Sequence, residues 1–281
     1  PLCVVCTEKR AALIRDLYHQ PITLEACQKD DGQVGPVENV QPTDIAYVIY
    51  TSGTSGQPKG VPIRHESIAN QILYHNEYLG LGAEDRILHM ASLAFDASLV
   101  EILMAVFAGA TIVVTPQLNK ENTEKISDWL RQNRVTTAIF PPAYLQLLEE
   151  VSNSALKRII STGEAIIAAD ALRYSLEMEI YNGYGPTECC IGATFHKVDP
   201  TRQHEYTKAG GIPIGKPFAN SAVYILNQHG ELLPKGMVGE IYVAGVGLSK
   251  GYLNQVYLTH EKFVANPYAR YEQENVMYRT G

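Results

Sequence analysis

The sequence predicts an α/β fold in which mostly parallel sheets are covered by helices, with a β-rich subdomain toward the C-terminus. Two observations predict it. Up to about residue 200, short β-branched runs alternate with amphipathic runs, and this alternation is typical of βαβ units. Beyond that point, strands follow one another with turns between them. We therefore expect residues 1–200 to form the α/β part and residues 201–281 to form a β-rich subdomain of the same core.

The individual elements follow from the spacing of the apolar residues. Short runs rich in β-branched residues predict strands over residues 2–5, 45–50, 86–90, 110–115, 136–140, 158–161, 178–181, 222–226 and 239–244. Apolar residues spaced three or four apart predict helices over residues 9–19, 66–79, 99–108, 123–133 and 168–177. Residues 28–43 are rich in Asp, Gly, Pro and Gln, which predicts a solvated loop. An Asn-Gln-His-Gly turn at residues 227–230 is expected to join the last two strands.

Composition and charge argue against several classes of protein. A net charge of −7 argues against nonspecific binding to nucleic acid, which needs a basic surface. The longest uncharged apolar run, residues 102–114, is thirteen residues long, whereas a membrane-spanning helix needs about 20. The chain begins at Pro1 without a basic leader, so we expect neither a secretory signal nor a membrane anchor. We interpret it as a part of a longer polypeptide.

The five cysteines are an odd number in a large chain, which favours reduced thiols and a cytoplasmic location over a disulfide framework. Cys3 and Cys6 have the spacing of a metal or redox pair, but no second pair or histidine cluster follows at metal-site spacing. Cys189 and Cys190 are adjacent, which could suggest nucleophilic catalysis. For both pairs we favour packing over chemistry.

The most distinctive segment is the loop over residues 50–60, Tyr-Thr-Ser-Gly-Thr-Ser-Gly-Gln-Pro-Lys-Gly, which directly follows an apolar strand. Its glycines can bring backbone N–H groups close to an anion, its hydroxyls add donors, and Lys59 adds positive charge. The loop can therefore wrap a polyphosphate; the alternative is a flexible Gly/Ser hairpin. The pattern Gly-x-x-x-x-Gly-Lys-Ser/Thr is absent, which argues against an ordinary P-loop NTPase.

Four segments resemble, in order, the motifs of the adenylate-forming superfamily, which includes acyl-CoA synthetases, luciferases and the adenylation domains of non-ribosomal peptide synthetases. They are the loop over residues 50–60, Asn-Gly-Tyr-Gly-Pro-Thr-Glu at residues 182–188, the Gly- and Glu-rich segment over residues 230–254, and Tyr-Arg-Thr-Gly at residues 278–281. The resemblance covers nearly the whole chain and is closest to the peptide-synthetase adenylation domains.

The resemblance implies a reaction that uses ATP and Mg²⁺, in which a substrate carboxylate attacks the α-phosphate and pyrophosphate leaves. It implies that Lys59 contacts the β- and γ-phosphates, that Thr187 contacts the α-phosphate, and that Glu188 holds the metal. The other ATP-binding positions that it implies are Thr51, Ser52, Gly53, Thr54, Ser55, Gly56, Gly163, Glu164, Ala165, Asn182, Tyr184 and Gly185. Tyr184 would stack on the adenine; the alternative is a core aromatic residue.

The sequence Phe95-Asp96-Ala97-Ser98 resembles the segment that places an aspartate against the α-ammonium group of an amino acid in peptide-synthetase adenylation domains. A carboxylate in an apolar pocket is costly unless it is paired, and an ammonium group is a natural partner. The alternative for Asp96 is an N-cap of the following helix.

The substrate-binding positions carried over from the family are Phe95, Asp96, Ala97, Val100, Ile139, Ile160, Thr162, Gly183, Ile191 and Gly192. Apart from Asp96 and Thr162, this wall is apolar, and Gly183 and Gly192 are expected to leave volume. A charged side chain would lose its hydration there without compensation. We therefore expect a mid-sized or large hydrophobic amino acid as the substrate.

The family's full domain extends beyond both ends of this chain. Its small C-terminal subdomain with a catalytic lysine is absent, so we expect the chain alone to catalyse adenylation weakly or not at all. In the family, the activated acyl group usually passes to a phosphopantetheine thiol on a peptidyl carrier protein domain, which is the partner that the resemblance implies. Two alternatives stay open: an acyl- or aryl-CoA ligase, and a nucleotide-binding fragment without activity.

Overall fold

A computed structural model describes residues 4–8, 10–11, 22–23, 39–52, 57–115, 126–148 and 154–281 of the chain. The chain divides into two compact units, Pro1–Val40 and Gln41–Gly281. In the first unit, β1 (Val5–Cys6) pairs in parallel with β2 (Ile22–Thr23). The predicted helix over residues 9–19 lies almost entirely outside the described residues. Within the described ranges, no helix is long and apolar enough to cross a membrane.

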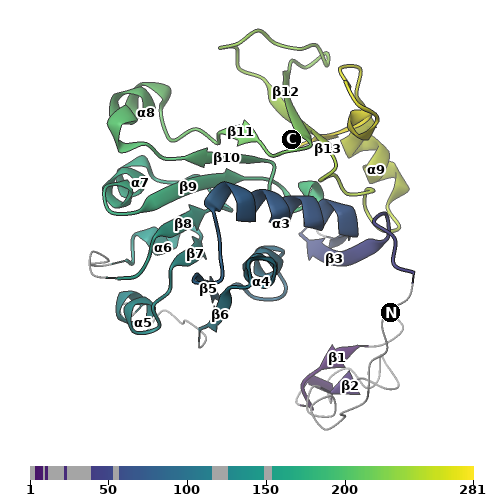
Figure 1. Ribbon diagram of the computed structural model, residues 1–281. Coiled ribbons are helices and arrows are strands. Elements are labelled where there is room, and N and C mark those ends of the chain that lie inside the picture. The colour runs from purple at the N-terminus through teal and green to yellow at the C-terminus, as the bar shows by residue number, and fades with distance from the viewer. Residues whose placement is uncertain are drawn as a thin grey trace. The chain divides into compact units, whose positions relative to one another are not determined.

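The second unit is built on a seven-stranded sheet with the strand order β11-β10-β9-β8-β7-β5-β6 (Figure 1). Its strands are β5 (Arg86–His89), β6 (Thr111–Val114), β7 (Thr137–Phe140), β8 (Arg158–Ser161), β9 (Glu179–Tyr184), β10 (Thr194–Lys197) and β11 (Lys216–Pro217). The strands from β6 to β9 are parallel, and β10 and β11 are antiparallel to their neighbours. The predicted α/β fold with a mostly parallel sheet is confirmed.

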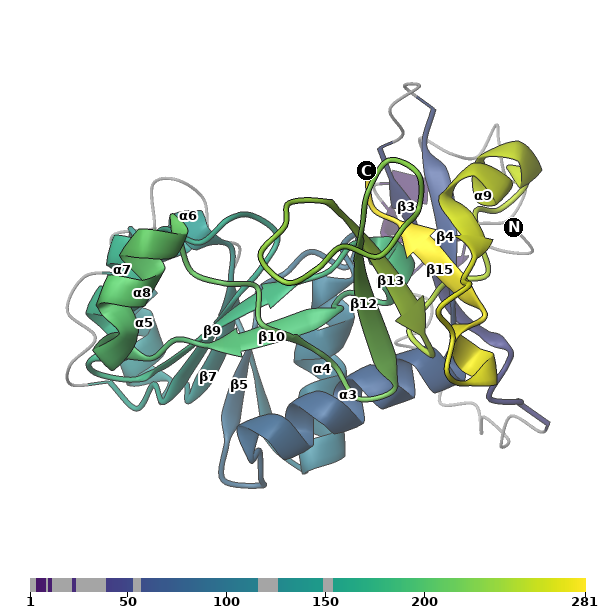
Figure 2. The ribbon, with the colours of Figure 1, turned by 90° about the horizontal axis from the view of Figure 1, so that it is seen from above.

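Helices cover both faces of this sheet. Figure 2 shows α3 (His65–Leu79) and α4 (Ala97–Ala108) on one side, with α5 (Ile126–Gln132), α7 (Ala168–Ser175) and α8 (Gln203–Ala209) on the other. The short helix α6 (Pro142–Leu145) packs with this second group. Successive residues of a strand point to opposite faces, so neighbours enter different cores. Ile87 packs with α3 and α4, whereas Leu88 packs in the cluster of α5 to α8. Such two-sided burial explains the continuous apolar runs of these strands.

A second sheet of four antiparallel strands follows, in the order β12-β13-β15-β14. It consists of β12 (Ser221–Leu226), β13 (Glu240–Gly245), β14 (Phe263–Ala265) and β15 (Val276–Arg279). Val243 and Tyr278 point toward the core that holds α3 and α4, while Tyr242 and Met277 form a small cluster on the other face. At the predicted turn, the Asn227 side chain accepts hydrogen bonds from the backbone amides of two following residues.

The region after residue 200 also contains helices that the strand pattern did not predict. They are α8, α9 (Val256–Lys262), and the 3₁₀ turns η3 (Pro200–Arg202) and η4 (Glu272–Glu274). Helices α8 and α9 are short and mostly exposed, so they lack the apolar stripe that reveals a helix in sequence. The seven-stranded sheet continues past residue 200 to β11, and the division of the core near residue 200 stays a prediction.

An antiparallel hairpin, β3 (Ile45–Thr51) and β4 (Lys59–Arg64), carries the loop over residues 50–60. Strand β4 was not predicted, because its sequence lies within the motif. Its Val61 and Ile63 are fully buried, and the Ser249 hydroxyl donates a hydrogen bond to the Pro62 carbonyl at 2.9 Å. The buried strand fixes Lys59, its first residue, at the edge of the core.

Candidate active site

A cavity of about 640 Å³ opens where four connecting loops meet. These loops leave β5, β7, β8 and β9 at their carboxyl ends, which is where open α/β sheets bind their ligands. Its volume lies in the range of small-molecule sites, roughly 300–1,000 Å³. The lining includes these predicted site residues: Phe95, Asp96, Ala97, Ile139, Thr162, Gly163, Glu164, Gly185, Thr187 and Ile191.

Lys59 and Glu188 form an ion pair beside this cavity. The Lys59 Nζ atom lies 2.9 Å from Glu188 Oε1, and the two side chains are 17% and 6% exposed. The Tyr252 hydroxyl donates to the same oxygen at 2.6 Å and lies 3.0 Å from Lys59 Nζ. Tyr278 extends the cluster, with its hydroxyl 3.4 Å from that of Tyr252. We call these four residues the Lys59–Glu188 network.

Glu188 is held in its ionised form by this network. Burial alone raises the pKa of its carboxyl, but the hydrogen bonds from Lys59 and Tyr252 and the Lys59 charge outweigh burial and bring that pKa below its ordinary value. Burial and the neighbouring carboxylate raise the pKa of Tyr252, so its hydroxyl stays protonated and can donate. The result is an oriented, negatively charged oxygen donor next to a lysine.

Asp96 stands immediately before α4, but its side chain makes no capping hydrogen bond to that helix. Hydrogen bonding from the Thr187 side chain and from the backbone amide of Ala97, the first residue of α4, lowers the pKa of its carboxyl. Burial raises the pKa of Asp96, the two hydrogen bonds oppose this effect, and the Glu188 charge adds to it, leaving the pKa raised. Asp96 therefore stands at the N-cap position of α4 without making the hydrogen bond of an N-cap. A cation placed in the cavity would stabilise its carboxylate.

A second, small cavity of about 20 Å³ lies next to the large one. It is lined by eight of the ten predicted substrate positions: Ala97, Val100, Ile139, Ile160, Thr162, Gly183, Ile191 and Gly192. Four of these residues, Ala97, Ile139, Thr162 and Ile191, also line the large cavity, so the two cavities adjoin. Asp96, at the edge of the large cavity, is placed to contact one end of a ligand. The adjoining small cavity is placed to receive the side chain of the same ligand.

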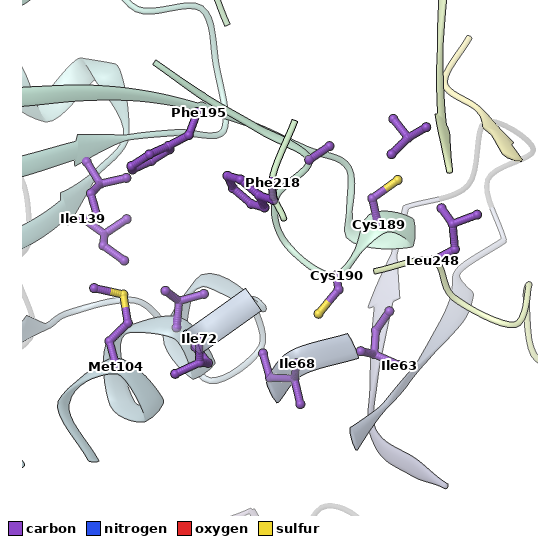
Figure 3. Close-up of a cluster of buried hydrophobic side chains, with 14 of the residues drawn as sticks. Ile63, Ile68, Ile72, Met104, Ile139, Cys189, Cys190, Phe195, Phe218 and Leu248 are labelled. Carbon is purple, nitrogen blue, oxygen red and sulfur yellow. The ribbon is translucent and has the colours of Figure 1, made fainter. Parts of the chain in front are cut away.

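The volume expected next to Gly192 is filled. A Cβ atom on Gly192 would lie 2.5 Å from the Phe218 ring and 2.7 Å from Gln71 Nε2. Figure 3 shows Phe218 and Phe195 above Ile72 and Met104 of α3 and α4 in the same buried cluster. The cavity therefore holds little more than the 10–15 Å³ or so that one water needs.

The backbone between Glu188 and the small cavity adopts an unusual turn. Cys190 and Ile191 have φ values of 56° and 75°, and the Gly192 amide donates to the Cys190 carbonyl at 2.8 Å. A positive φ is costly for a β-branched residue, about 1–3 kcal/mol. The turn points Ile191 into both cavities, and it is packed tightly because a Cβ on Gly185 would lie 2.4 Å from Gly192 Cα.

The remaining predicted ATP positions are spread along the loop and the strand ends. The Thr51 hydroxyl is buried and has no hydrogen-bond partner among the described residues, while Ser52 is exposed. Gly53, Thr54, Ser55 and Gly56 lie outside the described residues.

Of the predicted ATP positions near the strand ends, Tyr184 lines the small cavity and Ala165 is exposed just beyond Glu164. Asn182 is buried and donates to the Pro213 carbonyl at 3.0 Å. This bond ties the strand that carries the motif to the segment before β11.

The described cysteines Cys6, Cys189 and Cys190 are free thiols, whereas Cys3 and Cys27 lie outside the described residues. Cys189 and Cys190 are buried in the core and point in opposite directions (Figure 3). Burial raises the pKa of Cys190 to about 12 and that of Cys189 well above its ordinary value. Neither thiol is therefore activated as a nucleophile.

The structure brings several residues to the site that the sequence analysis missed. Tyr252 lies in the matched segment over residues 230–254 but was not singled out there, and Phe195 and Phe218 have the sequence of ordinary core residues. Gln71 and His75 did carry a signal, because they are polar residues four apart among the apolar positions of α3.

Glu188 suits the predicted Mg²⁺. Among the described residues, no three or more His, Cys, Asp or Glu side chains are grouped as a metal site. Mg²⁺ is commonly held by one or two carboxylates together with substrate phosphates. A single ionised carboxylate at the cavity edge has this chemistry.

Comparison with known proteins agrees with this geometry. The sequence profile of the family described as AMP-binding enzyme matches residues 5–253. The chain belongs to this family. The resemblance to the adenylation domains of non-ribosomal peptide synthetases is also confirmed, by relatives and by solved structures.

Two of these relatives are bacterial synthases. Tyrocidine synthase 1 of Brevibacillus parabrevis is 36% identical over 282 residues, covering 99% of this chain and 25% of the relative. Bacitracin synthase 3 of Bacillus licheniformis is 38% identical over 274 residues, covering 97% of this chain and 4% of the relative. The chain thus spans a quarter or less of these AMP-binding relatives.

Among solved structures, the AMPPNP-bound non-ribosomal peptide synthetase FmoA3 superposes with a TM-score of 0.82. It is 29% identical in sequence, and the match covers 100% of this chain and 30% of that one. The family fold is therefore shared over the whole chain.

Proposed function

We propose that this chain carries the active site for ATP-dependent activation of an amino acid, in which aminoacyl-AMP forms and pyrophosphate leaves. A carboxylate oxygen of the amino acid bonds to the α-phosphorus, and the bond from that phosphorus to the bridging oxygen of pyrophosphate breaks. The observation that carries the proposal is the placement of Thr187 and Asp96 together in the lining of the large cavity, which adjoins the small one. It joins a residue implied to hold the α-phosphate to one implied to hold the α-ammonium group.

The electrostatics support an amino acid over a fatty or aryl acid. Asp96 is a half-buried carboxylate whose pKa burial has raised, so an ammonium group placed beside it would relieve the desolvation cost. A substrate without an amino group leaves Asp96 without that partner. The apolar walls of the small cavity support a side chain that is hydrophobic along most of its length.

The Lys59–Glu188 network supports a phosphate site next to Asp96. In the proposed complex, Lys59 would contact the β- and γ-phosphates, and Thr187 would hold the α-phosphate in position for attack. Positioning and charge neutralisation account for most of the catalysis in such phosphoryl chemistry. Glu188 would hold Mg²⁺, which supplies positive charge to the phosphates when it is bound.

The product would pass to the phosphopantetheine thiol of a peptidyl carrier protein domain. An adenylate is an activated acyl group, and its attack by a thiol releases AMP and forms a thioester. The similarity to synthases that are much longer than this chain supports such a partner.

The test is amino-acid-dependent exchange of labelled pyrophosphate into ATP, measured with the intact protein on a panel of amino acids and fatty acids. We expect exchange with at least one amino acid, and a loss of roughly 100-fold in Asp96→Ala because the ammonium partner is removed. Asp128→Ala, an exposed aspartate of α5, is the matched control and should exchange normally.

Two outcomes would overturn this proposal. Exchange only with acids that lack an amino group would assign the chain to the acyl- or aryl-CoA ligases. Absence of both exchange and ATP binding would favour a scaffold without activity.

A further inference from the structure

The floor of the small cavity is polar, although its walls are apolar. Gln71 and His75 lie four residues apart on α3, so both side chains project from the same face of the helix. Both residues line the cavity, and they are only 3% and 4% exposed. Neither belongs to the motifs that identify the family.

Gln71 presents an unsatisfied donor. Its Nε2 atom is buried and has no hydrogen-bond partner in the described part of the chain. It lies under Gly192, where a Cβ would be 2.7 Å away. A buried donor without a partner costs about 1–3 kcal/mol, and such a group in a native structure calls for an explanation. A ligand atom that enters the cavity would remove this cost.

His75 presents an acceptor. Its Nδ1 atom lies 2.8 Å from the Gln71 carbonyl oxygen, which can only accept, so Nδ1 carries the proton. Burial lowers the pKa of His75 to about 4, so the ring is neutral near pH 7 and Nε2 keeps its lone pair. Phe195 and Phe218 pack against the ring in T-shaped contacts, with centroids 5.3 and 5.2 Å away.

We propose that the substrate side chain ends in a neutral group that both accepts and donates a hydrogen bond, a hydroxyl or a primary amide. This inference rests on the proposed amino-acid activation. The end group would take the place of the single water that the small cavity can hold, accepting from Gln71 and donating to His75, while its stem contacts the apolar walls shared with the large cavity. A purely apolar side chain leaves the Gln71 donor unpaired. An ammonium group can only donate hydrogen bonds, so it could not pair with the Gln71 donor. A carboxylate can only accept them, so it could not pair with the lone pair of His75.

The test compares amino acids in matched pairs that differ mainly in the polar group: threonine with valine, asparagine with leucine, and glutamine with methionine. Pyrophosphate exchange is measured with the intact protein, with glutamate and lysine as charged members. We expect the polar member of the best pair to exceed its apolar partner at least tenfold in kcat/KM. In Gln71→Leu, the ratio of kcat/KM between the polar and the apolar member of that pair should fall by about tenfold or more. The reason is that an apolar side chain can pack against the leucine without leaving a donor unpaired. Gln132→Leu, an exposed glutamine of α5, is the matched control and should keep the ratio.

The ratios of the unaltered protein test the inference even if Gln71→Leu does not fold. Preference for the apolar member of every pair, or for glutamate or lysine, would overturn it. An unchanged ratio in a folded Gln71→Leu protein would also overturn it. Failure of the proposed function looks different, because then no amino acid supports exchange at all.

Discussion

The Lys59–Glu188 network joins side chains from four distant segments through hydrogen bonds of 2.6–3.4 Å. The segments are β4, the 3₁₀ turn η2 (Thr187–Cys189), the stretch before α9, and β15. The small cavity is lined instead by the middle of the parallel sheet and by α3 and α4, and its walls meet by packing. The network therefore depends on a few charged atoms, whereas the cavity depends on volume. Substitutions should separate these two regions. A change in the network should alter the rate of exchange, whereas a change in the small cavity should alter which amino acid is preferred.

The largest effect is expected at Glu188. Glu188→Gln removes the charge that pairs with Lys59, and the amide nitrogen of the new side chain cannot accept a hydrogen bond. We expect pyrophosphate exchange to fall roughly 100- to 1000-fold, the range for loss of one electrostatic contact in an active site. The order of preference among amino acids should not change, since the small cavity is untouched.

Glu205→Gln is the control for this substitution. Glu205 pairs with Arg202 on the exposed surface of α8, where a salt bridge contributes little. A Glu188→Gln protein that exchanges within tenfold of the original, or that prefers another amino acid, would contradict the separation of the two regions.

The next effect concerns the floor of the small cavity and depends on pH. Burial lowers the pKa of His75 to about 4 from its ordinary 6.5, so the unfolded chain binds this proton more readily than the folded chain. The contribution of the neutral His75 imidazole to the free energy of unfolding is therefore fully present above pH 6.5. This contribution is lost as the pH falls toward 4. The expected loss is about 3 kcal/mol in the free energy of unfolding.

Urea unfolding from pH 7 to pH 4 measures this effect. Carboxylates also contribute to acid unfolding, so the informative quantity is the difference between the original protein and His75→Phe, in which the proton site is gone. The difference should change by about 3 kcal/mol across that range. His204→Phe, on the exposed face of α8, should show no such change. If the free energies of unfolding of His75→Phe and of the original protein changed by the same amount between pH 7 and pH 4, the imidazole would have to be charged or exposed in the folded protein.

Much of the fold was predictable because the signals were local. The parallel strands are short apolar runs separated by helical runs, and the order of these runs limits the topology to a covered, mostly parallel sheet. Strand β4 was missed because a glycine-rich motif ends within it, and α8 and α9 were missed because exposed, short helices have no apolar stripe.

The position of the candidate site could be predicted where motifs follow strands. Asp96 and Thr187 were selected from segments 91 positions apart, and they come together because the parallel strands β5 and β9 end at the same edge of the sheet. Tyr252 could not be found in this way, because it follows no strand of the parallel sheet and its role depends on its hydrogen bond to Glu188, 64 positions earlier in the chain. The volume at Gly192 could not be inferred either, since Phe218, which fills it, lies on a different segment.

The smallest effect is expected at two glycines of one motif, which separate folding from substrate choice. Gly185→Ala would place its Cβ 2.4 Å from Gly192 Cα and 2.5 Å from the Ala193 nitrogen, both backbone atoms that cannot yield. We expect a loss of about 2 kcal/mol in the free energy of unfolding, typical of overpacking. Gly183→Ala is the matched variant, because its Cβ would meet Phe195 and Thr162 at ordinary contact distances of 3.5 and 3.6 Å. It should unfold as the original does, yet fill part of the small cavity and shift exchange toward shorter side chains. Equal losses of stability in the two variants would show that the turn at Gly192 gives way, and that the cavity is not held rigidly by the backbone beneath it.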